Sequence, residues 1–220
     1  MKIIALNWKN TQTEESAQAL LKTVEDVGNI YPDYDWIIFP GDEFVDSLST
    51  KLSLGYQEIS NIPLSDLSPI PYALIWHMSQ RLAGKTDEEI KTEIDKLLNT
   101  TTTPFLCIGP LHEEDTLEWV ITEQLTVLEN WPKERPIVIA YEPWFAIWTG
   151  KTMTLEDIGI VSDILREALK DFTNKRIIYG WSVNNTNIAH ILEITDGVLI
   201  GTASQKSSTL LALSIALWQE

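Results

Sequence analysis

The chain has 220 residues, 44% of them hydrophobic and 22% charged, so it can bury one extended core, and it has no run of about 18 apolar residues that could cross a membrane. Sixteen Lys and Arg stand against 32 Asp and Glu, and the net charge of -16 argues against nucleic acid as a partner. A single cysteine excludes an internal disulfide, and without a charged and apolar leader we expect a cytoplasmic protein that does not contact membranes.

Short apolar runs alternate with longer amphipathic segments along the whole chain, which predicts parallel strands connected by helices. The expected strands are residues 3–6, 36–39, 52–57, 73–77, 105–108, 137–141, 177–179 and 197–200. Eight strands are what a closed (β/α)8 barrel needs. Because we find no repeat, linker or low-complexity segment, we expect one domain over residues 1–220.

The segments between these strands have helical periodicity. The expected helices are residues 14–27, 42–51, 87–98, 116–128, 155–172, 187–192 and 207–218. Thr86 and Thr154 stand where N-terminal caps are expected. The segment between the third and fourth strands contains three prolines and has room for about one helical turn.

An open, doubly wound sheet has the same local pattern, and periodicity does not separate the two folds. An open sheet that binds a nucleotide usually has a Gly-rich loop after its first strand. Here Asn7, Trp8, Lys9 and Asn10 follow that strand without a glycine. The missing loop favours the closed barrel.

In such a barrel the active site forms at the carboxyl ends of the strands. Asn7 and Lys9 follow the first strand, His77 the fourth and Glu142 the sixth. A carboxylate base, a neutral imidazole and a fixed ammonium group together suit proton abstraction next to a carbonyl. This chemistry needs no cofactor or metal, and the three histidines of the chain lack the spacing of metal ligands.

Several short strings carry a family resemblance. In chain order they are Asn7-Trp8-Lys9, Ala140-Tyr141-Glu142-Pro143, Thr149-Gly150-Lys151-Thr152, Tyr179-Gly180 with Ser182-Val183, and residues 196–201 with Ala203-Ser204. Together they resemble the triosephosphate isomerase family over nearly the whole chain. The resemblance implies a TIM barrel and an isomerase of glycolysis and gluconeogenesis. Such an enzyme interconverts dihydroxyacetone phosphate and glyceraldehyde 3-phosphate by enediolate proton transfer.

The resemblance also implies a role for each residue at the site. Glu142 would shuttle the proton, His77 would polarise the carbonyl, and Lys9 and Asn7 would bind the substrate and stabilise the enediolate. Further substrate-binding positions would be Trp148, Ser182, Gly201 and Thr202. The lid would comprise Pro143, Trp144, Phe145, Ala146, Ile147, Trp148, Thr149, Gly150 and Lys151, with Tyr179 and Ser182 as latches.

The chain departs from the family where its members have glycines around the mouth of the barrel. Trp76, Trp148, Trp181 and Thr202 replace them, and the family's glutamate after the histidine is absent. If such a position needs a positive φ, the replacement costs about 1 kcal/mol or more. An alternative is therefore a non-catalytic or reassigned barrel, whose Trp-lined mouth binds another ligand or none.

The link between the third and fourth strands is short. In the family this loop inserts into a partner subunit and braces the Asn/Lys pair. Residues 57–77 leave too little chain for that protrusion, so we expect a monomer or a dimer through another surface. The partner that we expect is a small phosphorylated triose. Because the brace on Lys9 is lost, we also expect the isomerase activity to be lowered.

Overall fold

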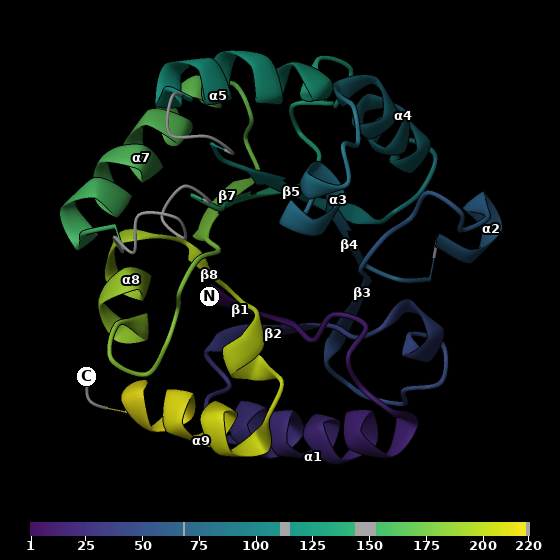
Figure 1. Cartoon of the computed structure of the whole chain (residues 1–220), viewed down its shortest axis with the longest axis vertical. Helices are drawn as coiled ribbons and strands as arrows, with labels where there is room; N and C mark the ends of the chain where they lie inside the picture. The colour runs from purple at the N-terminus through teal and green to yellow at the C-terminus, as the bar shows by residue number, and fades with distance from the viewer. Residues whose placement is uncertain (68, 111–114, 144–152, 219–220) are drawn as a thin grey trace.

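The computed structural model describes all residues except 68, 111–114, 144–152 and 219–220. Its parallel strands follow one another around a closed barrel in chain order, and the expectation of a (β/α)8 barrel is confirmed (Figure 1). The strands are β1 (Lys2–Asn7), β2 (Tyr34–Phe39), β3 (Ser53–Tyr56), β4 (Tyr72–Ile75), β5 (Thr103–Ile108), β6 (Ile137–Tyr141), β7 (Lys175–Tyr179) and β8 (Gly197–Ile200).

Helices surround the barrel (Figure 1). They are α1 (Glu14–Ile30), α2 (Leu64–Leu67), α3 (Met78–Leu82), α4 (Asp87–Leu97), α5 (Leu117–Gln124), α7 (Leu155–Ala168), α8 (Ile188–Ile194) and α9 (Ser207–Ala216), with 3-10 turns η1 (Asp42–Phe44), η2 (Leu125–Leu128) and η3 (Thr202–Ser204). Thr86 and Thr154 cap α4 and α7 as predicted, each accepting a hydrogen bond from the third residue of its helix. None of the helices within the described ranges is long and apolar enough to span a membrane.

The helix expected over residues 42–51 is wrong. Only η1 forms there, and the chain then continues in turns. The segment is rich in Asp, Ser and Thr, whose side chains compete for backbone hydrogen bonds and favour turns over helix interiors. The Asp42 carboxylate binds the backbone N–H of Gln57 at 2.6 Å instead of capping a helix. This contact ties η1 to the end of β3.

Side chains alternate between two apolar layers along each strand. Ile3 and Ala5 of β1 point into the barrel, where they meet residues such as Phe105 and Cys107. Ile4 and Leu6 point outward against the helices. Alternation of this kind fills a small barrel and leaves its rims free for polar residues.

The link between β3 and β4 folds back onto its own barrel. It contains α2, the single helical turn that was predicted. Ile59 and Leu67 of the link are fully buried, and Lys96 of α4 donates to the carbonyls of Ile59 and Ile62 at 2.7 and 2.5 Å. The link therefore packs against α4 and does not project away from the barrel.

Candidate active site

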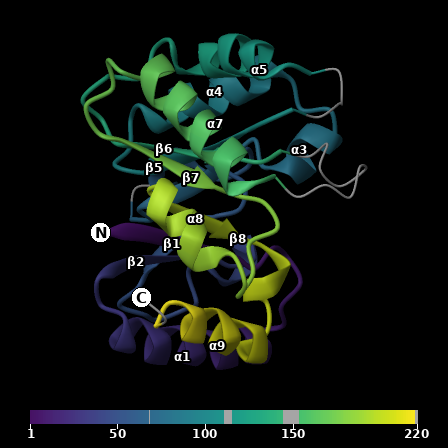
Figure 2. The same cartoon turned by 90° about the vertical axis from the view of Figure 1, so that its left-hand side faces the viewer.

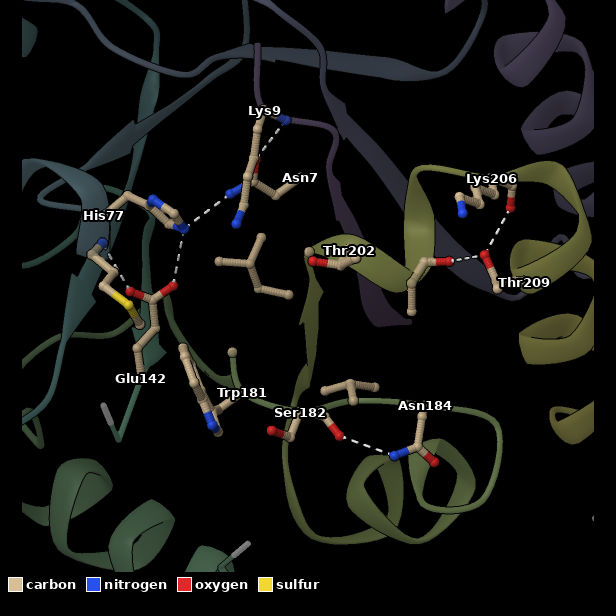
Figure 3. A pocket seen from close by; sticks show the side chains of 16 residues that line it. Asn7, Lys9, His77, Glu142, Trp181, Ser182, Asn184, Thr202, Lys206 and Thr209 are labelled. Carbon is tan, nitrogen blue, oxygen red and sulfur yellow. Dashed lines mark hydrogen bonds and ion pairs between the residues drawn. The ribbon is translucent and has the colours of Figure 1, made fainter. Parts of the chain in front are cut away.

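A cavity of about 730 Å³ lies at the carboxyl ends of the strands. Figure 2 shows this end of the barrel on the side of α3, opposite the N-terminus. The cavity brings together the candidate residues Asn7, Lys9, His77, Glu142, Ser182, Gly201 and Thr202 (Figure 3). These residues lie at the carboxyl ends of five separate strands, so only the closed barrel places them around one space.

Asn7, His77 and Glu142 form a line of contacts across one wall of this cavity (Figure 3). Asn7 Nδ2 lies 3.0 Å from His77 Nε2, and Glu142 Oε1 lies 3.5 Å from the same ring nitrogen. Asn7 and Glu142 are buried, at 1% and 2% exposure. A substrate in the cavity therefore meets an imidazole with an amide on one side and a carboxylate on the other.

The imidazole of His77 is held in its neutral form. Burial lowers its pKa from the ordinary 6.5, and the nearby charges of Lys9 and Arg81 lower it further, against the opposing effect of Glu142. His77 also stands at the N-terminus of α3, where the first N–H groups of the helix have no carbonyl partner within it. A neutral imidazole near pH 7 fits the role of an electrophile.

Two groups besides His77 hold the Glu142 carboxylate. Its Oε2 accepts from the backbone N–H of Met78 at 3.2 Å and from Arg81 Nη2 at 3.3 Å. The Arg81 side chain is completely buried, and its other terminal nitrogen donates to the carbonyl of Gly109. Because a buried carboxylate is costly without a partner, this guanidinium group stabilises the Glu142 side chain where it lies.

The backbone is strained at three points around the mouth. Among the described residues other than glycine, positive φ occurs at Lys9 (55°), Trp76 (59°) and Ser182 (48°). Lys9 and Ser182 line the cavity, and Trp76 directly precedes His77. Residues with side chains adopt this conformation at a cost of about 1–2 kcal/mol, and such strain concentrates at functional sites.

Gly109 ends β5 beside Glu142. Its φ is 151°, and a Cβ atom built there would lie 2.2 Å from the carbonyl oxygen of Glu142. No side chain fits in that gap. Gly109 thus lets the backbone of β5 approach Glu142 closely enough for Arg81 to bridge the two.

The opposite wall of the cavity offers donors for an anion. The N–H groups of Thr202 and Ala203 open the turn η3 and have no carbonyl partner within it. Figure 3 shows Lys9 and Lys206 extending toward the space near Thr202. Positive groups and free N–H groups around one space are the donors that a phosphate requires.

Two described replacements at the mouth, Trp181 and Thr202, do not close the site. Trp181 and Thr202 are not among the residues with positive φ, so their side chains add no backbone strain of that kind. The Trp181 ring lies beside Glu142, across the cavity from Thr202 (Figure 3). It packs against the outer apolar layer and leaves the space at Gly201 and Thr202 open.

Most of the expected lid falls outside the described residues. That applies to Trp144, Phe145, Ala146, Ile147, Trp148, Thr149, Gly150 and Lys151. Pro143 is buried directly after Glu142. Tyr179 is buried, and its hydroxyl bonds to none of the described residues, so its role as a latch stays a prediction.

Sequence reasoning did not assign Gln57, Arg81 or Lys206. Gln57 ends the third predicted strand, which is the position that singled out His77 and Glu142, so the same criterion applies to it. Gln57 Nε2 donates to Asn7 Oδ1 at 2.8 Å. No simple sequence signal separates the buried Arg81 or the cavity-lining Lys206 from a surface cation. Within the described parts of the chain, no three His, Cys, Asp or Glu side chains cluster as metal ligands would.

Comparison with known proteins agrees with this geometry. The sequence model described as triosephosphate isomerase matches residues 2–217. Triosephosphate isomerase of Francisella philomiragia is 31% identical, covering 94% of this chain and 93% of that protein. The protein of the same name from Dictyoglomus thermophilum is 33% identical, covering 93% of this chain and 95% of that protein. With a match over nearly its full length and a shared barrel, the chain belongs to the triosephosphate isomerase family.

Proposed function

We propose that this protein interconverts dihydroxyacetone phosphate and glyceraldehyde 3-phosphate, with Glu142 as the base and His77 as the electrophile. The observation that carries the proposal is the contact line from Asn7 through His77 to Glu142 beside a space rich in anion donors. A base and a hydrogen-bond donor on one wall can act on neighbouring carbons and oxygens of a three-carbon substrate.

The phosphate would bind the N–H groups of Ser182, Thr202 and Ala203 and the ammonium group of Lys9. All four residues line the cavity, and Ser182 and Thr202 lie across it from Glu142 (Figure 3). Binding there directs the carbon end of the substrate toward Glu142 and His77. Holding a substrate in a reactive orientation contributes a large share of the rate in enzymes of this kind.

The reaction is a proton transfer between adjacent carbons. Glu142 takes a proton from the carbon next to the carbonyl, the C–H electron pair becomes the C=C bond, and the carbonyl π pair moves onto oxygen. His77 and Asn7 would donate hydrogen bonds to that oxygen, and Lys9 would stabilise its charge. The hydroxyl proton of the neighbouring carbon then passes to that oxygen, its O–H electron pair forms the new carbonyl, and the C=C pair takes the proton back from Glu142 at the other carbon. No electron acceptor and no cofactor takes part.

The decisive test is a coupled isomerisation assay on purified protein beside the Glu142→Gln variant. We expect turnover in the wild type and a loss of at least about a hundredfold in the variant, because an amide cannot act as the base. Glu118→Gln, on exposed α5, is the matched control and should retain full turnover. Host enzyme carried through purification would give equal activity in all three preparations.

The opposite result has a defined meaning. A well-folded wild type without turnover would reject the proposal and favour the reassigned barrel, in which the mouth binds another ligand. Equal turnover in wild type and Glu142→Gln above the level of the host enzyme would remove Glu142 from the mechanism.

We further propose that the protein acts as a cytoplasmic monomer in glycolysis and gluconeogenesis. The packing of the β3–β4 link against α4 supports the monomer, because this link occupies its own barrel. A lone, fully buried thiol at Cys107 is in keeping with a reducing compartment.

A further inference from the structure

Lys9 enters the cavity from a strained backbone. Its φ is 55°, in the left-handed region that residues with side chains disfavour. Because a peptide group is planar, rotation of the plane between Trp8 and Lys9 changes this φ together with the ψ of Trp8. Contacts that hold both ends of the plane therefore fix the direction in which the Lys9 side chain leaves the backbone.

The N–H end of this peptide is held by Asn7. The backbone N–H of Lys9 donates to Asn7 Oδ1 at 3.0 Å (Figure 3). The same oxygen accepts from Gln57 Nε2 at 2.8 Å, and Gln57 Nε2 also donates to the carbonyl of Phe39 at 2.6 Å. Both hydrogens of the Gln57 amide are thus used. Gln57 fixes the Asn7 side chain, which in turn holds the N–H of Lys9.

The carbonyl end of the peptide is held from a different loop. Trp8 O accepts from Thr11 Oγ1 at 3.0 Å and from Gln205 Nε2 at 3.1 Å. Thr11 belongs to the same loop and moves with it, whereas Gln205 directly follows η3, 197 positions further along the chain. The N–H of Trp8 adds an attachment to β2, because it donates to the Phe39 carbonyl at 2.9 Å.

We infer that Gln57 and Gln205 are positioning residues that hold the Trp8–Lys9 peptide at its two ends and so keep Lys9 in its strained conformation. Neither glutamine is among the described residues that line the cavity, so each acts through the peptide and not on a substrate. Both belong to the same chain as Lys9. A brace from a second subunit, for which the β3–β4 link is too short, is thus replaced by side chains of one barrel.

The consequence for catalysis rests on the proposed function, in which the Lys9 ammonium group binds the phosphate and stabilises the enediolate. If the backbone of Lys9 relaxes to an ordinary φ, its side chain leaves in another direction and the ammonium group is displaced. Small displacements of catalytic groups are costly. Loss of either glutamine should therefore raise KM and lower kcat together, with kcat/KM reduced about tenfold or more.

Amide hydrogen exchange on substrate-free protein labelled with ¹⁵N-lysine tests the inference directly. Exchange of the Lys9 N–H requires its bond to Asn7 to open. Gln57→Met and Gln205→Met keep a side chain of similar length and add no charge, but they remove the donor. We expect Lys9 to exchange about threefold faster or more in each variant, as for the loss of one hydrogen bond.

Two controls separate a local effect from general loosening of the fold. The backbone signals of the other lysines report general loosening in the same spectra, and a Lys9→Arg variant assigns the Lys9 signal. Gln18→Met makes the same chemical change on the exposed face of α1, away from this loop. It should leave the exchange of Lys9 unchanged.

Each result decides for or against the inference. Unchanged Lys9 exchange in folded Gln57→Met or Gln205→Met would reject the role of that glutamine. An equal acceleration at the other lysines, or in Gln18→Met, would show that the effect is not local and would reject both roles. If Gln57→Met does not fold, Gln57→Glu keeps the shape but cannot donate, and the same acceleration is expected in it.

The exchange experiment is independent of the proposed function. It uses no substrate, so an inactive wild type would reject the isomerase and leave the exchange result standing. Turnover that falls in the variants while Lys9 exchange stays unchanged would keep the isomerase and reject the positioning roles.

Discussion

At His77, burial and the positive charges of Lys9 and Arg81 act in the same direction, and the charge of Glu142 opposes them. Removal from water disfavours the imidazolium ion, and the positive charges of Lys9 and Arg81 disfavour it further. Glu142 alone favours protonation, and its 3.5 Å contact is too long to reverse the balance. Arg81 pairs with the other oxygen of this carboxylate, Oε2, at 3.3 Å. The attraction between Glu142 and a protonated His77 is weaker for that reason. Base and electrophile therefore lie side by side without exchanging a proton.

The lowered pKa of His77 predicts a pH-dependent part of stability. Below the ordinary pKa of 6.5 the unfolded chain binds a proton that the folded chain rejects. The free energy of unfolding must then fall as pH decreases from 6.5 toward the lowered pKa of the folded state. His77→Gln lacks this contribution, so the wild type should lose more stability than the variant between pH 7.5 and 5.5.

Urea unfolding of both proteins at the two pH values measures this difference. Carboxylates elsewhere titrate equally in both chains and cancel in the comparison. Parallel losses in wild type and variant would mean that His77 titrates alike in the folded and unfolded states, contrary to the prediction.

At the scale of elements, side chains of the segment that follows it hold the link between β3 and β4 in place. Lys85 joins this link to α4, contacting Glu93 at 2.6 Å and Ser60 at 2.9 Å. Lys96 adds two bonds to the carbonyls of the link. Short links rarely bury their own backbone, because unpaired carbonyls are costly. Here Lys96 of the neighbouring helix supplies a donor to two of them.

Replacing Lys96 tests whether these bonds hold the link. Lys96→Met keeps most of the aliphatic stem but removes the Lys96 bonds to both carbonyls, and the Ile59 carbonyl then keeps only the backbone N–H of Ile62 at 3.3 Å. We expect the free energy of unfolding to fall by about 1–3 kcal/mol, as for loss of a charged partner of buried polar groups. Lys170→Met removes an exposed pair with Glu167 and should leave stability unchanged. Equal urea midpoints for both variants would contradict this account.

The strands and the four central site residues could be predicted because their signals are local. A buried β-rich run followed by a polar residue marks a strand end wherever it lies. The failed helix over residues 42–51 and the unassigned Gln57 share a different cause. Asp42 and Gln57 are 15 residues apart, and Gln57 and Asn7 are 50 apart, so their bonds depend on the closed barrel. No window of sequence contains such contacts.

For the molecule as a whole, the contacts that hold the proposed reaction centre bear on its oligomeric state. Asn7 is braced by Gln57 of the same barrel, so this contact needs no second subunit. A net charge of -16 also opposes close approach of two copies. One feature favours association, since Leu211, Ile215 and Trp218 form an exposed apolar stripe along α9 and the turn after it.

The area of the apolar stripe decides between repulsion by the net charge and association through α9. A stable dimer buries about 800 Å² per partner, over some 20–30 residues, and three exposed side chains on one helix supply only a small part of that area. We therefore expect a monomer of 25.0 kDa in light scattering, with isomerase activity per chain unchanged over a hundredfold dilution. Trp218→Ser should leave both unaltered. If the mass were doubled and the variant restored the monomer, α9 would be the interface. Activity that fell on dilution would mean that the site, despite its internal brace, depends on a second copy.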